Sequence, residues 1–306
     1  MKAFPSHRSS RSSGFVSKAS RLGRCSVATG LLSLATGEIV VAATDPAGAS
    51  TEVRLTANAT LPSDSALECF KIETNVATYY LEKSGAGLAA LIDRNGNDWI
   101  GFRPDPGSRS AGEFRGFPNA VHQQGGSFFH PMNQNTGEST TKVEQIETGH
   151  VAISATSSNG LWACRYDFFP NRCTFTMTRM SPEHKYWILY EGTPGGELDE
   201  TDWWMTSDVR RPQSVMSNHE GDIPDPEWIV FGDANRDRVI FLLHHADDSH
   251  PDRFYQARGE MTVLGFGRRG GEKHLSSVPH SVSIGLLETT DPAVIDREMT
   301  KIQARQ

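Results

Sequence analysis

The irregular stretch Arg103–Ser139 contains the first group of residues that could do chemistry, namely Arg115, Asn119, His122 and His130. A structureless loop of this length inside a compact domain is usually functional. A guanidinium, an amide and two imidazoles suit the binding of sugar hydroxyls or a carboxylate, and proton transfer near neutral pH. We predict that Arg115 and Asn119 bind substrate and that His122 and His130 are catalytic. The alternative is that polar groups here only satisfy the loop backbone.

A second group of candidate residues lies where a strand-like run ends in a turn rich in glycine and proline. Tyr190 and Glu191 precede that turn, and Asp199, Trp203 and Trp204 follow it. A phenol and a carboxylate at a strand end could serve as acid and base, and an indole beside carboxylates can grip a pyranose ring. We predict catalytic roles for Tyr190 and Glu191, and substrate binding by the other three. A capped strand with both tryptophans in the core is the alternative.

We expect the two segments, Arg115–His130 and Tyr190–Asp199, to line one common pocket. Their residue types are complementary, with a cation and imidazoles on one segment and a phenol and carboxylates on the other. In such a pocket Glu191 would hold a histidine in its charged form, and Arg115 would bind a carboxylate or a hydroxyl pair in a fork.

The chain contains no motif that implies a cofactor or a metal. P-loop, dinucleotide-binding and Gly-x-Ser-x-Gly motifs are missing from the sequence, so we expect no cofactor. His244 and His245 are adjacent at a strand end, where neighbouring side chains point to opposite faces, so this pair cannot chelate one ion without a bulge. We therefore predict no metal site.

The N-terminal region has the composition of a targeting segment. Residues 1–43 contain six basic residues and one acid. Within this segment the basic start is followed by a short apolar run and then by small residues, which is typical of a secretory signal peptide. A transit peptide is the alternative. We predict a signal peptide at 1–43, a disordered linker at 44–66 and a single domain at 67–306, in a secreted or periplasmic protein. That domain would hold Cys69, Cys164 and Cys173, an odd set that makes no disulfide framework.

The remaining sequence predicts an all-β fold. Short runs with period-two alternation are separated by turn residues, most clearly in Arg172–Thr178, and Pro170-Asn171 is a hairpin signal before that run. One helix is expected at the C-terminus, with Asp291 as N-cap and Ile295, Met299 and Ile302 on one face. The pattern favours an antiparallel β-sandwich with one C-terminal helix.

Residues 78–102 resemble the opening of the galactose-mutarotase-like β-supersandwich found in carbohydrate epimerases and polysaccharide lyases. The stretch passes a glycine, runs to Leu91-Ile92-Asp93, turns at Asn95-Gly96 and returns. The resemblance implies a sandwich whose concave sheet holds a sugar. It implies a His acid and a Glu base in epimerases and mutarotases, with an Arg and another His binding the ring. In lyases it implies Tyr or His bases with Arg or Asn on a uronate.

We therefore expect a secreted carbohydrate-active protein, either a polysaccharide lyase or a sugar epimerase or mutarotase, that uses His, Glu and Tyr groups. A non-catalytic carbohydrate-binding module and a glycoside hydrolase are the alternatives. Its partner would be a poly- or oligosaccharide. Without residues 1–43 the chain has 24 basic and 36 acidic residues, a balance that opposes nucleic acid. No apolar run is long enough for a membrane span, and the oligomeric state is left open.

Overall fold

The computed structural model describes residues 38–41, 52–103, 115–122, 127–131 and 138–304. Contacts along the chain divide it into two units, residues 1–35 and 36–306, and every element described below belongs to the second unit. The predicted signal peptide lies mostly outside the described residues and stays a prediction.

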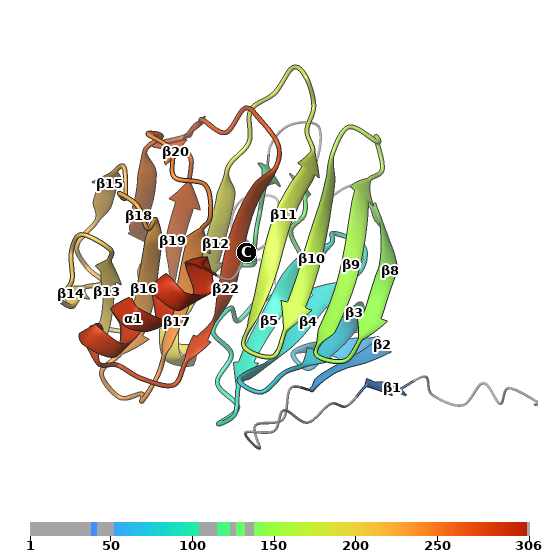
Figure 1. Cartoon of the computed structure of the whole chain (residues 1–306), viewed down its shortest axis with the longest axis horizontal. Helices are drawn as coiled ribbons and strands as arrows, with labels where there is room; N and C mark the ends of the chain where they lie inside the picture. Colours follow the sequence, from blue (N-terminus) through green and yellow to red (C-terminus); the bar gives the residue numbers. More distant parts are fainter. Residues whose placement is uncertain (1–37, 42–51, 104–114, 123–126, 132–137, 305–306) are drawn as a thin grey trace, which may run out of the picture. The chain divides into compact units, whose positions relative to one another are not determined.

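The largest sheet has nine strands, and all its neighbouring strands are antiparallel (Figure 1). In spatial order the strands are β14 (Gln213–Ser214), β13 (Asp202–Thr206), β16 (Trp228–Asp233), β17 (Val239–His244), β22 (His280–Leu287), β11 (Arg172–Arg179), β10 (Ala163–Phe169), β9 (His150–Ser157) and β8 (Ser139–Glu147).

The described residues also form two smaller antiparallel sheets and two short hairpins. The five-stranded sheet has the order β1 (Glu38–Val41), β2 (Val53–Leu61), β3 (Asp64–Glu73), β4 (Ala77–Glu82) and β5 (Gly87–Asp93). The four-stranded sheet has the order β12 (Ile188–Gly192), β19 (Met261–Phe266), β18 (Asp252–Ala257) and β15 (His219–Gly221). The hairpins are β6 (Val121–His122) with β7 (Ser127–Phe128), and β20 (Arg268–Arg269) with β21 (Glu272–Lys273).

Both smaller sheets pack against the nine-stranded sheet through one continuous apolar core. Tyr79 of β4 meets Phe168 of β10 edge-on, with ring centroids 5.5 Å apart. Phe254 of β18 lies 5.1 Å from Phe231 of β16. Burial of these rings and of the other apolar side chains of the core drives the stacking of the layers. The expected antiparallel β-sandwich is confirmed.

The C-terminal helix α1 (Pro292–Gln303) crosses the other face of the nine-stranded sheet (Figure 1). Asp291 caps the helix by accepting hydrogen bonds from the backbone N–H groups of Ala293 and Val294. Its apolar stripe, predicted from the sequence, is buried against β13, β16 and β17; the stripe consists of Ile295, Met299 and Ile302. The sheet is therefore covered on both faces at this point.

The sandwich begins earlier in the chain than expected, so the boundary at Leu67 is wrong. Strands β2 and β3 start at Val53 and Asp64, inside the predicted linker 44–66. Residues rich in Ala and Thr suggested a linker, but apolar residues recur at every second position of β2 and face the core; they are Val53, Leu55, Ala57, Ala59 and Leu61.

Two further expectations are confirmed. Strands β10 and β11 form the hairpin across Pro170-Asn171, with Phe168 opposite Cys173. Cys69, Cys164 and Cys173 are free thiols. Within the part of the chain that the structure describes, no helix has the length and apolarity needed to cross a bilayer.

Candidate functional site

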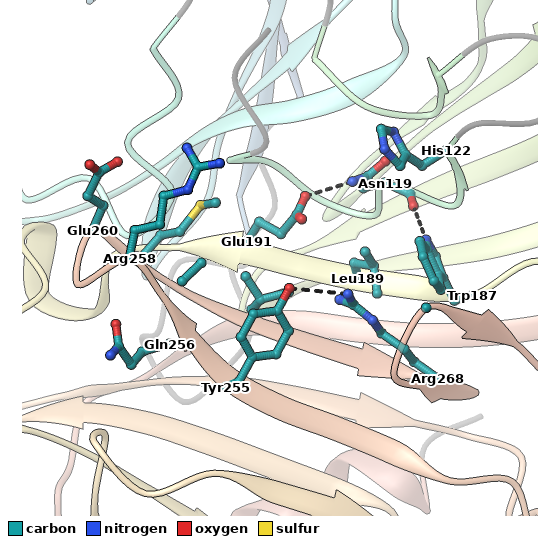
Figure 2. Close-up of a pocket in the computed structure, with 14 residues that line it drawn as sticks. Asn119, His122, Trp187, Leu189, Glu191, Tyr255, Gln256, Arg258, Glu260 and Arg268 are labelled. Atoms are coloured by element: carbon teal, nitrogen blue, oxygen red, sulfur yellow. Dashed lines mark hydrogen bonds between the residues drawn. The ribbon is translucent and has the colours of Figure 1, made fainter. Parts of the chain in front are cut away.

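A cavity of about 490 Å³ opens on the face of the four-stranded sheet that points away from the core (Figure 2). This volume is within the range typical of small-molecule sites. Alternation along β12 explains the lining, because Trp187, Leu189 and Glu191 face the cavity whereas Ile188 and Tyr190 join the core. Strands β18 and β19 contribute further lining residues, including Tyr255 and Val263.

The segment that carries Asn119 runs along the edge of β12 like an added strand. Gly116 and Glu191 exchange two backbone hydrogen bonds, and the N–H of Leu189 donates to the carbonyl of Pro118. The indole N–H of Trp187 donates to the carbonyl of Asn119 at 2.9 Å. These bonds bring the part of the predicted segment Arg115–His130 that contains Asn119 beside Glu191.

Glu191 is the buried carboxylate of the cavity, with 5% of its surface exposed. The side-chain amide of Asn119 donates to Glu191 Oε2 at 2.7 Å, and His130 Nε2 lies 3.7 Å from the same oxygen. Strand β12 fixes the carboxylate from one side and the added segment holds it from the other. A carboxylate fixed in this way can exchange a proton with a bound hydroxyl.

The two predicted imidazoles occupy different positions around Glu191. His122 lines the cavity and is half-buried; burial lowers its pKa to about 4, and the nearby charges of His130, Lys273 and Arg268 act in the same direction. His130 is buried behind the cavity, and its Nδ1 donates to the carbonyl of Pro131 at 2.9 Å. His122 can therefore touch a ligand, whereas His130 positions Glu191.

The wall formed by Trp187 and Tyr255 contains cations held on aromatic rings. The guanidinium of Arg268 lies 4.7 Å from the ring centre of Trp187 and 5.1 Å from that of Tyr255. It donates to the Tyr255 hydroxyl at 3.2 Å, as Figure 2 shows. Lys273 lies 4.5 Å from the Trp187 ring centre, and burial lowers the pKa of its ammonium to about 8. These contacts fix cations beside the cavity.

Arg268 has capacity left for a ligand. Its Nε donates to the carbonyl of Gly270 and its Nη2 to Tyr255, but its buried Nη1 has no hydrogen-bond partner among the described residues. Leaving a buried charged donor unpaired costs free energy, so an acceptor supplied by a ligand would be favoured. In the sequence, the only signal of this group is a basic pair followed by two glycines at residues 268–271, which did not suggest a site.

Arg115 lies at the rim instead of in the cavity. Its Nη1 donates to the carbonyl of Gly101 at 3.1 Å and its Nη2 to the carbonyl of Glu260 at 3.2 Å. Glu260 lines the cavity, so Arg115 holds a lining segment through its backbone. Arg115 does not line this cavity, so the prediction that it binds substrate is wrong for this cavity.

Tyr190 does not face the cavity, which corrects its predicted catalytic role. The side chain is fully buried, its hydroxyl donates to the carbonyl of Trp99, and its ring stacks on Phe231. Burial raises the pKa of Tyr190 well above its ordinary value. A phenol in this environment is a core hydrogen-bond donor.

The structure also separates Asp199, Trp203 and Trp204 from the cavity, so the predicted common pocket is only half correct. Asp199 accepts from the backbone N–H of Thr201 at 2.7 Å, which is ordinary turn chemistry. Trp203 packs over Gly232 of the neighbouring strand. Trp204 is buried beside Phe254, and its indole N–H donates to Ser217.

Three carboxylates near the turn that contains Asp199 form a separate cluster. Oxygens of Asp199, Asp202 and Asp233 lie within 4.8 Å of one another. Burial raises the pKa of Asp202 to about 8, and the charges of Asp199 and Asp233 add to the effect. The cluster contributes no lining to the cavity of Glu191.

No protein-family model matches the chain, and no curated protein matches it. Among solved structures, HI1317 shares 14% identity with a TM-score of 0.48, over 82% of this chain and 100% of that one. The YeaD protein from Salmonella typhimurium shares 12% identity with a TM-score of 0.48, over 82% and 97%. The galactose mutarotase related enzyme from Lactobacillus acidophilus shares 10% identity with a TM-score of 0.46, over 73% and 98%. At these levels the similarities assign no activity or residue role.

Proposed function

We propose that this cavity binds an acidic sugar and that Glu191 catalyses proton transfer on it, in the manner of a sugar mutarotase or epimerase. One observation carries the proposal: a buried carboxylate held by Asn119 shares a cavity with a buried guanidinium nitrogen of Arg268 that has no partner among the described residues. A base and an anion-binding group in one small cavity are what such a reaction needs.

The charges of the cavity support an acidic ligand. The full chain has a net charge of −7, yet around this cavity three cations face two carboxylates. Arg258 and Arg268 line the cavity with Glu191 and Glu260, and Lys273 packs against its Trp187 wall. The faces of Trp187 and Tyr255 are occupied by cations, so these rings hold charge in place instead of stacking on a sugar. A carboxylate accepting from the Arg268 fork would fix the orientation of the ring.

The reaction would use Glu191 as base. Glu191 takes the proton of the anomeric hydroxyl, the bond between the anomeric carbon and the ring oxygen breaks, and that oxygen takes a proton from water. Rotation and the reverse steps give the other anomer. His122 is neutral above about pH 4, so it can offer a hydrogen bond to a sugar oxygen without repelling Arg268.

A polysaccharide lyase is the second candidate, because a guanidinium that neutralises a uronate also favours removal of the neighbouring proton. The volume of the cavity favours the first candidate, since a space of about 490 Å³ suits a small sugar better than a long chain.

The test is to incubate the purified chain with neutral and acidic monosaccharides, oligosaccharides and polysaccharides, following four readouts. Exchange between anomers by NMR supports the mutarotase, whereas absorbance of an unsaturated uronate identifies the lyase. New reducing ends without that absorbance indicate a hydrolase. Binding that weakens in Arg268→Ala without turnover indicates a binding module. If no sugar binds, the proposed function is wrong.

We also propose that the protein is exported, because residues 1–43 combine a basic start, a short apolar run and small residues. Fractionation of cells that express the full chain, with detection of the protein outside the cytoplasm, is the test. Recovery only from the cytoplasm, at full length, would contradict it.

A further inference from the structure

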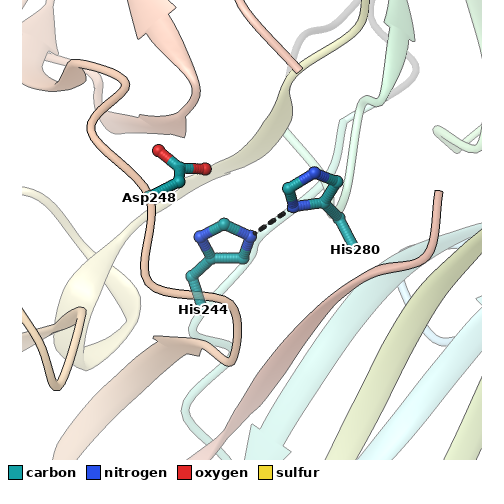
Figure 3. A group of neighbouring side chains, drawn as sticks. All are labelled: His244, Asp248 and His280. Atoms are coloured by element: carbon teal, nitrogen blue, oxygen red, sulfur yellow. Dashed lines mark hydrogen bonds between the residues drawn. The ribbon is translucent and has the colours of Figure 1, made fainter. Parts of the chain in front are cut away.

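Two histidines from neighbouring strands meet at the end of the nine-stranded sheet (Figure 3). His244 is the last residue of β17 and pairs with Val282 of β22, while His280 is the first residue of β22, two positions earlier. Residues two apart on a strand share a face, so both imidazoles lie on the same side of the sheet. His244 Nε2 and His280 Nδ1 are 2.9 Å apart.

The outer nitrogen of each ring is hydrogen-bonded, which fixes where the inner nitrogens point. His244 Nδ1 lies 2.8 Å from Glu227 Oε2, and His280 Nε2 lies 3.1 Å from Ser277 Oγ. Tyr186 packs edge-on against His280, with ring centroids 6.2 Å apart. An imidazole whose second nitrogen contacts a carboxylate or a hydroxyl is the usual arrangement of a metal-binding histidine.

Asp248 supplies a third donor from the loop that follows β17. Ligand atoms of His244, Asp248 and His280 all lie within 4.8 Å of one another, and Figure 3 shows the carboxylate near both rings. Asp248 Oδ1 accepts from the N–H of His250, whereas its buried Oδ2 has no hydrogen-bond partner among the described residues. A buried, unpaired carboxylate oxygen beside two imidazoles is costly unless a cation compensates it.

We propose that His244 Nε2, His280 Nδ1 and the Asp248 carboxylate bind a divalent transition metal ion of the zinc class. Two imidazoles and one carboxylate suit zinc or its neighbours, whereas calcium and magnesium prefer oxygen ligands. The ion would replace the proton that the two ring nitrogens share, and that proton would be released to solvent. The site has no residue in common with the cavity of Glu191, so this inference does not depend on the proposed function.

The geometry needs only small adjustments to accept the ion. Ligands at about 2.0–2.1 Å in a tetrahedral site lie roughly 3.3 Å apart, so the two nitrogens must separate by a few tenths of an ångström from their 2.9 Å. Asp248 lies on a loop between strands and can approach more easily than the histidines. Three protein ligands leave a fourth position for water or another donor.

Metal binding would join three parts of the fold. His244 ends β17, His280 begins β22, and Asp248 belongs to the loop that leads to β18. A ligand that binds only the folded chain adds to the free energy of unfolding. We therefore expect zinc to raise the melting temperature.

The experiment uses the full chain without an affinity tag. Its metal content is measured as isolated, and Zn²⁺ is then titrated by calorimetry and Co²⁺ by visible absorption. The expected result is one equivalent bound, with the absorption of a four-coordinate cobalt site and a higher melting temperature. Ca²⁺ should produce no such change. Failure to bind Zn²⁺ or Co²⁺ would overturn the proposal.

Matched variants locate the site. Asp248→Asn and His280→Ala should each weaken Zn²⁺ binding by about 10-fold to 100-fold or more. His245→Ala is the control, because this neighbouring imidazole points away and bonds to Ser283. Circular dichroism checks that each variant folds, and Asp248→Asn keeps the test valid if His280→Ala does not. Unchanged affinity in folded Asp248→Asn, or an equal loss in His245→Ala, would refute the assignment.

Discussion

Two neighbouring segments of this chain contain carboxylates in different surroundings. Glu191 ends β12 with its side chain in a cavity, where Asn119 fixes it and Arg268 lies on another wall. Asp199 and Asp202 come only a few residues later, yet the first accepts from the backbone of its own turn and the second is buried at the start of β13. Residue type alone does not distinguish these two regions.

The tryptophans repeat this contrast. Trp187 lines the cavity and carries cations on its faces. Trp204 is buried against Phe254, between the nine-stranded and four-stranded sheets. A functional group is therefore recognised by an open space beside it and by polar atoms left for a ligand. Variants that affect one region and spare the other test this distinction.

The largest effect is expected from Trp204→Ala, which tests whether this residue belongs to the core. Removing a buried indole leaves a cavity, so the free energy of unfolding should fall by about 3–5 kcal/mol. Urea denaturation measures the loss. The milder Trp204→Phe should fold and bind the sugar ligand with unchanged affinity. A weaker affinity in Trp204→Phe would indicate that Trp204 contributes to sugar binding.

Glu191→Gln should produce the next largest effect, on catalysis. The amide keeps the shape of the side chain but cannot accept a proton, so turnover should fall by about 100-fold or more. The rate of anomer exchange, or of whichever reaction the substrate panel identifies, is the measurement. Asp202→Asn, in the other region, is the matched control and should keep its turnover. An equal loss of turnover in Glu191→Gln and Asp202→Asn would show that the two regions do not differ in their role in catalysis.

The sequence predicted the architecture and part of the site because these depend on local patterns. Period-two alternation identified the β-sandwich, and the cap and apolar stripe identified α1. The same alternation also separates Tyr190 from Glu191, as it separates His244 from His245. Tyr190 and Glu191 are adjacent in one strand, so the alternation of side chains already predicts that they point to opposite faces and cannot share one cavity. The start of β2 was likewise visible, in apolar residues at alternate positions from Val53 to Leu61.

Other features depend on pairings that the sequence does not specify. Arg268 reaches the cavity because its strand β20 follows β19, and β19 pairs with β12. The paired residues of β12 and β19 are about 70 positions apart in the sequence. His280 meets His244 only through the register of β17 with β22. The register between strands that are distant in the sequence depends on packing throughout the core. It therefore cannot be predicted from local sequence patterns.

Arg268→Ala should have a smaller effect, on affinity for an acidic sugar. Loss of the charged hydrogen bonds should weaken binding by about 10-fold to 100-fold, whereas a neutral sugar of the same shape should lose much less. Arg268→Lys keeps the charge without the fork and should show an intermediate loss. Calorimetric titration of both sugars measures the difference. Equal losses for the two sugars would show that Arg268 supports the wall without binding a carboxylate.

The last effect concerns the pH dependence of stability at Asp202. Its folded pKa is raised to about 8, chiefly by burial, from an ordinary value near 4. The folded chain therefore holds a proton that the unfolded chain releases, and the free energy of unfolding should fall as the pH rises from about 4 to about 8. Asp202→Asn has no proton to hold, so its stability relative to the parent should grow across this range, by up to about 1.4 kcal/mol per pH unit. Melting temperatures of both proteins at several pH values provide the measurement. A difference that stays constant between pH 4 and pH 8 would show that Asp202 is ionised in the folded protein, and the turn region would then resemble the Glu191 cavity more closely than its contacts indicate.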